Sequence, residues 1–286
     1  MKQGSKEWLQ HRKNYIGASD APIIMGVSPW RTRYQLWEEK LGLNGGQEET
    51  EAMRYGKRKE EEARRAYEDY TGNLLSTDEK DTLIYHPTKK FMMASLDGIT
   101  FDRSIAVELK NANAEDHALA KKGIVPEKYY PQVQHQFACE SFNVLHYFSY
   151  REGDRALVEV TFDPPYIDRL FEEETRFWDL VLNLEAPELT ERDYCQLEND
   201  SEWRNLAAEW STITRQLADL EKKEKSYREA LIAKANGMNA KGCGVSLSKI
   251  VRKGSVDYKK IPELIGIDLE PYRKDPSESW RIVCQK

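Results

Sequence analysis

Cysteine is scarce in this chain of 286 residues, and its four cysteines stand singly. Cys139, Cys195, Cys243 and Cys284 form no Cys-x-x-Cys pair, the spacing that is typical of zinc ribbons and iron–sulfur clusters. The sequence therefore argues against those metal centres. It predicts reduced, mostly buried thiols, as in cytosolic proteins.

Long apolar runs are also missing from the sequence. No run approaches the roughly 18 residues that a membrane-spanning helix needs, and the first eight residues contain no apolar signal region. We therefore expect no membrane association and a cytoplasmic location.

An excess of basic residues is missing as well, since the formal net charge is −6. Affinity for phosphate groups comes from Lys and Arg, so a protein that binds nucleic acid over its whole surface is disfavoured. An enzyme with a local basic channel remains compatible with this charge, because the carboxylates of a metal site also make the total more negative.

The composition is that of a globular protein, with 40% hydrophobic and 32% charged residues, seven Trp and fifteen Tyr. Along the chain, the patterns predict helices, a meander of short strands, a helix, two paired strands and a further helix. This order is typical of the α/β class, here an α+β mixed sheet flanked by helices.

The character of the sequence changes near residue 186, where Ala186-Pro187 begins a linker-like segment. We predict one domain over residues 1–190 and a smaller accessory module over residues 195–286. This module is expected to contain a helical stalk, either one long helix or a helical hairpin, followed by a short β-sheet. Its narrow apolar stripe indicates a packing seam; the stripe consists of Trp203, Leu206, Trp210, Ile213, Leu217, Leu220 and Tyr227.

A basic cluster follows on the predicted small sheet of this module. It comprises Lys249, Arg252, Lys253, Lys259 and Lys260. A solvated surface is the plainer explanation of the cluster, and a contact to DNA or to a protein partner is the more specific alternative. The sequence leaves both interpretations open.

The most informative pattern is an acidic residue, Asp97, followed by Glu108-Leu109-Lys110 on the next short strand. Side chains alternate faces along a strand, so Glu108 and Lys110 share one face and Leu109 points into the core. A hairpin of this length brings Asp97 beside Glu108. Two carboxylates and an ammonium group then share one pocket.

Two close carboxylates repel each other unless a cation joins them, and hard oxygen ligands suit magnesium or manganese. A lysine beside them holds or deprotonates a water near a phosphate. This combination is typical of metal-assisted phosphodiester hydrolysis. An Asp-Gly turn followed by a solvated Glu-x-Lys face is the alternative interpretation of the same spacing.

Several separated motifs together resemble the phage lambda exonuclease type of recombination nuclease, the YqaJ viral recombinase family. This family belongs to the restriction-endonuclease-like PD-(D/E)XK superfamily. The resemblance covers roughly residues 5–185 and implies a restriction-endonuclease-like core. The superfamily signature corresponds to Asp97, Glu108 and Lys110, with Ser95-Leu96 at the place where the signature has its proline.

The resemblance implies two Mg²⁺ ions, for which Mn²⁺ is an acceptable substitute. Their ligands would be Glu60, Asp97, Glu108 and the backbone carbonyl of Leu109, with Lys110 positioning the attacking water. Gln132 is implied to lie in the active site, since it matches the glutamine of a family helix. The neighbouring His135 is expected to be a polar helix residue and not a metal ligand.

The same resemblance implies a pocket for the 5′-terminal phosphate. Arg12, Ser19 and Ser95 match the arginine and the two serines of that pocket, and Tyr129 matches a tyrosine that lines the site. Three of these residues also have a structural explanation: a surface arginine for Arg12, a helix N-cap for Ser19, and core packing for Tyr129.

The implied activity is a Mg²⁺-dependent 5′→3′ exonuclease that digests linear double-stranded DNA and exposes 3′ single strands for phage-type recombination by strand annealing. The family also implies a homotrimer and a single-strand annealing protein as partner. Two alternatives remain: an endonuclease of the same fold, and a non-catalytic protein that binds DNA ends.

Overall fold

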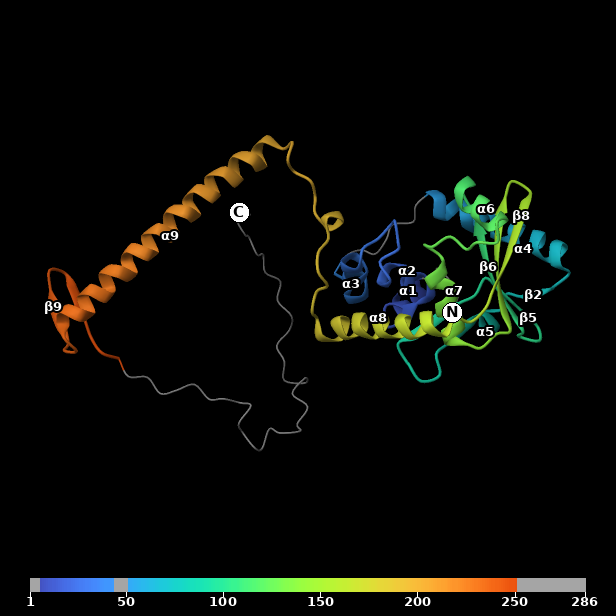
Figure 1. Ribbon diagram of the computed structural model, residues 1–286, viewed down its shortest axis with the longest axis horizontal. Coiled ribbons are helices and arrows are strands. Elements are labelled where there is room, and N and C mark those ends of the chain that lie inside the picture. Colours follow the sequence, from blue (N-terminus) through green and yellow to red (C-terminus); the bar gives the residue numbers. More distant parts are fainter. Residues whose placement is uncertain (1–5, 44–50, 251–286) are drawn as a thin grey trace, which may run out of the picture. The chain divides into compact units, whose positions relative to one another are not determined.

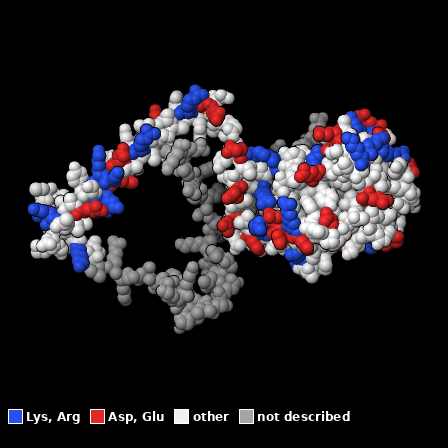
Figure 2. Space-filling model, in the orientation of Figure 1, with Lys and Arg blue, Asp and Glu red and all other residues white. Residues whose placement is uncertain are grey.

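The computed structural model describes residues 6–43 and 51–250, and the predictions on residues 252–260 lie outside this part. The chain divides into two compact units, Met1–Cys195 and Gln196–Lys286 (Figure 1). The first contains the sheets and helices that carry the candidate site. Acidic and basic side chains are interspersed over the face of this unit that Figure 2 shows.

The main sheet of the first unit has five strands in the order β2-β5-β6-β7-β8. Strand β6 runs parallel to β7 and antiparallel to β5, so the sheet is mixed, as the sequence predicted. The parallel pairing is possible because helices and loops between residues 112 and 143 carry the chain across the sheet. The strands are β2 Leu75–Ser76, β5 Gly98–Thr100, β6 Ile105–Asn111, β7 Val144–Arg151 and β8 Asp154–Val160.

A second, smaller sheet has the order β1-β4-β3, formed by β1 (Ile16–Gly17), β4 (Met92–Ser95) and β3 (Leu83–Tyr85). Strand β1 runs parallel to β4, with Ile16 opposite Met92 and Gly17 opposite Met93. The sequence did not predict β1, because a two-residue strand is too short to show an alternating pattern and is recognisable only through its distant partner.

Helices cover both faces of the main sheet. Helix α7 lies on one face and α4 on the other, and α8 and the N-terminal helices pack around α7. The helical elements of this unit are α1 Lys6–Arg12, the 3₁₀ turn η1 Ala18–Asp20, α2 Ala21–Ile24, α3 Arg33–Leu41, α4 Glu51–Thr71, α5 Glu79–Thr82, α6 Ala114–Lys121, α7 Tyr130–Cys139, α8 Pro164–Asn183 and the 3₁₀ turn η2 Glu191–Asp193.

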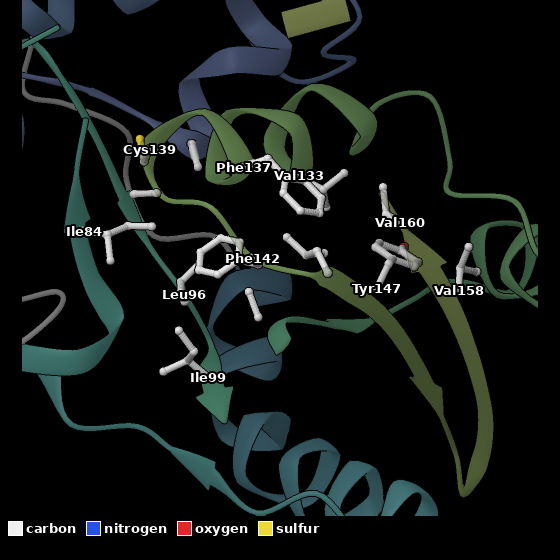
Figure 3. Close-up of a cluster of buried hydrophobic side chains, with 14 of the residues drawn as sticks. Ile84, Leu96, Ile99, Val133, Phe137, Cys139, Phe142, Tyr147, Val158 and Val160 are labelled. Carbon is white, nitrogen blue, oxygen red and sulfur yellow. The ribbon is translucent and has the colours of Figure 1, made fainter. Parts of the chain in front are cut away.

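The larger hydrophobic core lies between α7 and the sheet (Figure 3). Val133 and Phe137 are one helical turn apart, so they point together from α7 toward the strands. They are packed in one cluster with Leu145 and Tyr147 of β7 and Val158 of β8. This packing fixes the height of α7 over β6 and β7, and therefore the position of every polar side chain on the sheet-facing side of that helix.

The opposite face of the sheet packs on α4. Ala63 and Tyr67 of α4 are fully buried and belong to one cluster with Val107, Leu109 and Phe148. Strand β6 thus buries Leu109 against α4, while Glu108 lies on the α7 side. The predicted alternation of Glu108, Leu109 and Lys110 is confirmed.

The second unit begins with a single helix, α9 (Ser201–Ala235), followed by the hairpin of β9 (Ala240–Gly242) and β10 (Val245–Leu247). The stalk is therefore one helix and not a helical hairpin. Its apolar stripe is largely exposed within the described residues, with Leu206 58% and Ile213 62% exposed. The predicted packing seam has no partner in this part of the chain.

Across residues 6–43 and 51–250, none of the helices combines the length and the apolar character that a bilayer crossing demands.

Candidate active site

The hairpin of β5 and β6 places Asp97 next to Glu108. Gly98 lies opposite Val107 in the antiparallel register, so Asp97 and Glu108 follow as the next position beyond the last strand pair. The carboxylate of Asp97 accepts a hydrogen bond from the backbone N–H of Leu109 at 2.7 Å through Oδ2. The predicted neighbourhood of the two acidic residues is thus present in the fold.

Glu108 is almost completely buried, with 1% of its surface exposed, and it receives three side-chain donors. Its Oε1 accepts from Lys110 Nζ and from Gln132 Nε2, the latter at 2.6 Å. Its Oε2 accepts from Gln136 Nε2, also at 2.6 Å. A buried carboxylate requires such donors because burial removes its hydration. The donors fix both oxygens of Glu108 in one orientation.

Lys110 lies between the acidic residues and an aromatic ring. Its Nζ bonds Glu108 and stands 5.2 Å from the ring centroid of Tyr129. Burial alone would lower the pKa of Lys110, but the charges of Glu108 and Asp97 raise it above its ordinary value. Lys110 is therefore a cation in this arrangement, suited to holding a water or a phosphate oxygen.

Asp97 experiences an excess of negative charge. Burial, followed by the charge of Glu108, raises the pKa of Asp97 well above its usual range, and Glu60 of α4 adds to this increase while Lys110 opposes it. Glu60 itself is exposed. Its electrostatic effect shows that α4 brings a third carboxylate toward the pair. The charges of Glu108 and Glu60 therefore both act on Asp97.

These residues fit a divalent cation by charge and by chemistry. Asp97 and Glu108 lie beside one lysine, the charge of Glu60 acts on Asp97 from α4, and carboxylate oxygens are the ligands that Mg²⁺ and Mn²⁺ prefer. In the described residues, however, no group of three or more His, Cys, Asp and Glu side chains is already arranged as a metal site. In this structure Lys110 and the two glutamines bond both oxygens of Glu108.

The predicted phosphate-binding residues Arg12 and Ser19 are in direct contact. Arg12 Nη2 donates to Ser19 Oγ at 2.6 Å and forms an ion pair with Asp20 Oδ1 at 2.5 Å. The N-cap of α2 is Asp20 and not Ser19. The hydroxyl of Ser19 therefore serves Arg12. Of the two N-cap candidates that the sequence offers, Ser19 and Asp20, the structure has Asp20 at this position.

Asp20 is the buried centre of this group, with 1% exposed. Its second oxygen, Oδ2, accepts from Lys40 Nζ at 2.6 Å and from the backbone N–H of Gly17 at 3.0 Å. Burial alone would raise the pKa of Asp20, but Arg12 and Lys40 hold it below its ordinary value. The carboxylate is therefore a permanent anchor for the guanidinium of Arg12.

The parallel pairing of β1 with β4 brings the two predicted serines to the same edge. Gly17 lies opposite Met93, and the chain runs two residues further to Ser19 on one side and to Ser95 on the other. Since Asp97 follows Ser95 by two residues, this short connection links the Arg12 group to the acidic pair.

The sequence did not identify three residues of this region: Gln136, Asp20 and Lys40. Gln136 had a detectable signal, because it follows Gln132 by four residues on a helix and must share its face. Asp20 was considered only as a helix cap. Lys40 gave no signal, since a lysine on an amphipathic helix is normally a surface residue.

His135 points away from the acidic pair. Its Nδ1 lies 2.7 Å from Glu174 Oε1 and its Nε2 lies 2.9 Å from the carbonyl oxygen of Met93, and both His135 and Glu174 are fully buried. The residue ties α7 to α8 and β4, in agreement with its predicted place on a helix.

The mixed sheet with its flanking helices and the acidic hairpin define the class of this protein: a restriction-endonuclease-like nuclease fold. Comparison with solved structures supports this class. An alkaline exonuclease from Laribacter hongkongensis, LHK-Exo, matches with a TM-score of 0.54 and 26% identity, over 63% of this chain and 94% of that one. Its complex with dAMP has the same fold, at a TM-score of 0.55 and 24% identity over the same shares of the two chains.

Residues 7–143 match the family model of the YqaJ-like viral recombinase domain. The uncharacterized protein YqaJ of Bacillus subtilis (strain 168) is 28% identical over 245 residues, which cover 79% of this chain and 76% of the relative. The resemblance seen in the sequence motifs is thus confirmed at the level of the family.

Proposed function

We propose that the protein is a Mg²⁺-dependent exonuclease that digests linear double-stranded DNA from the 5′ end and leaves 3′ single strands for recombination by strand annealing. The observation that carries this proposal is the Asp97–Glu108–Lys110 group around the buried Glu108, joined through β4 to the Arg12–Ser19 group. The similarity to the alkaline exonuclease LHK-Exo, whose chain is matched over 94% of its length, supports an exonuclease activity.

Glu60, Asp97, Glu108 and the Leu109 carbonyl would hold the divalent ions. When bound, such ions lower the pKa of a water and stabilise the charge on the leaving oxygen. Glu108 is kept in place for this task by Gln132 and Gln136. Lys110, held as a cation beside Glu108, orients a water or a phosphate oxygen through its ammonium group.

Arg12 and the hydroxyls of Ser19 and Ser95 would bind the 5′-terminal phosphate. An arginine fork with hydroxyl donors suits a dianionic phosphate. Asp20 neutralises part of the charge of Arg12, so Arg12 alone would attract the terminal phosphate less strongly. The hydroxyl groups of the two serines would add hydrogen bonds to this phosphate. An enzyme that holds this phosphate near its metal site cleaves the bonds next to the 5′ end.

As further parts of the proposal, three copies of the chain surround the DNA, and a single-strand annealing protein loads onto the exposed 3′ strand. These two points rest on the family resemblance. Sedimentation or light scattering of the full chain tests the trimer, and a monomer at assay concentrations would contradict it.

The decisive experiment follows linear duplex DNA labelled at either the 5′ or the 3′ end, with Mg²⁺ and with EDTA. We expect early release of the 5′ label as a short product, faster digestion of 5′-phosphorylated ends, and no cleavage in EDTA. Closed circular plasmid is the control. Cleavage of the plasmid would favour an endonuclease, and binding of ends without cleavage in Mg²⁺ would favour a non-catalytic end-binding protein.

A further inference from the structure

Trp30 is a large aromatic side chain that stands in solvent close to the acidic site. It is 57% exposed, whereas Trp8 and Trp37 in the same unit are each 8% exposed. One exposed apolar residue is common on protein surfaces and needs no function. The surroundings of Trp30 distinguish it from such a residue.

Trp30 continues a row of aromatic and cationic groups that begins at Lys110. The ring of Trp30 lies 6.0 Å from the ring of Tyr129, with an angle of 35° between the two planes. Lys128 Nζ lies 5.4 Å from both ring centroids. Because Lys110 Nζ lies over the same Tyr129 ring, the Trp30 side chain is one aromatic ring away from the lysine of the acidic site.

The backbone under Trp30 is held in place by several hydrogen bonds. Ser28 Oγ accepts from the backbone N–H groups of Trp30 and Arg31, both at 3.3 Å. Arg192 donates to the carbonyl oxygens of Ser28 and Pro29 at 3.1 and 2.9 Å. The exposed ring is therefore presented on a fixed loop.

Lys128 is fixed in the same manner. Its Nζ forms an ion pair with Asp116 Oδ2 at 2.8 Å, and Asp116 is buried. This pair holds the ammonium group beside the Trp30 and Tyr129 rings. An aromatic ring and an ammonium group that are both positioned in advance lose little conformational entropy when a ligand binds.

Nucleobases have the chemistry that matches this surface. Every base offers a flat π-face that stacks on tryptophan, and the adjoining phosphate is attracted by lysine. We propose that Trp30, with Lys128 beside it, is a stacking subsite for a nucleobase at the end of the DNA, next to the strand that the acidic site cleaves. This inference rests on the proposed function, because it takes DNA as the substrate.

The test measures binding without cleavage. Duplex DNA with 2-aminopurine at its 5′ end is titrated with the full-length protein in EDTA and, separately, in Ca²⁺. The variants are Trp30→Ala, Trp30→Gln and Trp30→Phe, and Trp203→Ala is the matched control because Trp203 is 56% exposed in the other unit. Thermal melting confirms that each variant is folded.

We expect the wild-type protein to change the 2-aminopurine fluorescence on binding, since stacking quenches this base. Trp30→Ala and Trp30→Gln should lose that change and bind the duplex end about 5- to 100-fold more weakly. Trp30→Phe should retain most of both signals, because phenylalanine keeps a π-face. Trp203→Ala should equal the wild type.

Two outcomes overturn the proposal: wild-type quenching and affinity in Trp30→Ala, or an effect of Trp203→Ala as large as that of Trp30→Ala. The second outcome would show that the loss of any exposed tryptophan weakens binding, and not the loss of Trp30 in particular. Cleavage assays in Mg²⁺ separate this inference from the proposed function. If the wild type does not cut DNA but loses quenching when Trp30 is replaced, only the proposed function fails. If it neither cuts nor binds DNA ends, both fail.

Discussion

Gln136 Nε2 donates to Glu108 Oε2 at 2.6 Å, from a position one helical turn beyond Gln132. Gln136 is fully buried, and its Oε1 has no hydrogen-bond partner among the described residues. The amide is therefore committed to the carboxylate as a donor. Gln136 is a positioning residue for Glu108, while Gln132 bonds the other oxygen.

Replacing Gln136 by leucine should leave Glu108 Oε2 buried without that donor. We expect a loss of about 1–3 kcal/mol in the free energy of unfolding. We also expect a roughly 10- to 100-fold rise in the Mg²⁺ concentration for half-maximal cleavage, since partners that orient a ligand tune its affinity. Urea unfolding and a Mg²⁺ titration of duplex digestion measure the two effects.

Gln134→Leu provides the matched control for this prediction. Gln134 is equally buried on α7 but bonds the carbonyl oxygen of Thr161 and the backbone N–H of Asp163. It should lose stability and keep the wild-type Mg²⁺ requirement. Equal Mg²⁺ dependence of the Gln136 and Gln134 variants would contradict the positioning role.

Asp97→Asn should lower the cleavage rate by about a hundredfold or more. The same substitution should stabilise the metal-free protein. The folded-state pKa of Asp97 is raised, so wild-type stability falls as the pH rises from the ordinary Asp pKa of about 3.9 through the raised value. An asparagine side chain carries no charge, so the stability of the variant does not fall for this reason as the pH rises. In EDTA, the melting temperature of the variant should therefore be higher than that of the wild type at pH 8. Near pH 3 the two melting temperatures should be equal.

Addition of Mg²⁺ should reverse that order, because an ion that binds only the native state stabilises it. The wild type should gain thermal stability with Mg²⁺, and Asp97→Asn should gain much less. A lower melting temperature of Asp97→Asn at pH 8 in EDTA would argue against the excess negative charge at this site.

The Asp20 carboxylate should be essential for stability through Lys40 and for phosphate recognition through Arg12. Asp20→Asn leaves the buried Lys40 without its counter-ion, and we expect a loss of about 3–5 kcal/mol. Because the pKa of Asp20 is lowered, the stability from this pair is present at neutral pH and is lost only as the pH falls below the ordinary carboxyl range.

A double variant separates the two roles. Asp20→Leu with Lys40→Met replaces the buried ion pair by apolar side chains and should recover most of the stability. It should not recover the preference for 5′-phosphorylated ends, since Arg12 has lost its anchor. The measurement is the ratio of digestion rates on 5′-phosphate and 5′-hydroxyl duplexes. A wild-type ratio in the double variant would remove Asp20 from phosphate recognition.

The buried pair of His135 and Glu174 should make stability fall at alkaline pH. Burial alone would lower the pKa of His135, but Glu174 raises it well above its ordinary value of 6.5. The stabilisation is therefore complete below pH 6.5 and is lost as the pH rises through the raised pKa. His135→Gln should flatten the alkaline side of the stability curve.

His146 provides a control, because its pKa is shifted in the opposite direction to that of His135. Burial lowers the pKa of His146, so its contribution is present above pH 6.5 and is lost as the pH falls through the lowered value. His146→Gln should change the acid side of the curve and leave the alkaline side as in the wild type. An alkaline decline that survives in His135→Gln would show that other groups cause it.

The sequence was sufficient for the part of the site that depends on strand alternation. The period of two placed Glu108 and Lys110 on one face and Leu109 on the other, and the short hairpin brought Asp97 to Glu108. The helix that starts at Pro131 and contains Gln132 was visible in the sequence from its proline, and the structure has it as α7. These features are local, so that each follows from residues close together in the chain.

Contacts between distant segments could not be predicted. Lys40 reaches Asp20 across 20 residues, and its burial depends on how α3 packs against the N-terminal segment. The parallel pairing of β1 with β4 joins residues more than 70 positions apart. A single sequence contains no signal for either contact. The charge of Lys40 suggests a surface residue, and the two residues of β1 are too few to suggest a strand.

The bond from Leu109 N–H to Asp97 Oδ2 closes the hairpin where its last backbone pair has ended. The side-chain oxygen of Asp97 accepts the hydrogen bond that the backbone carbonyl of one more strand residue would otherwise accept. The same carboxylate therefore supports the backbone in addition to any part it takes in the reaction. Truncating it to alanine would fray the β5–β6 end, so that a loss of cleavage would have two causes at once, whereas asparagine retains an oxygen to cap that amide.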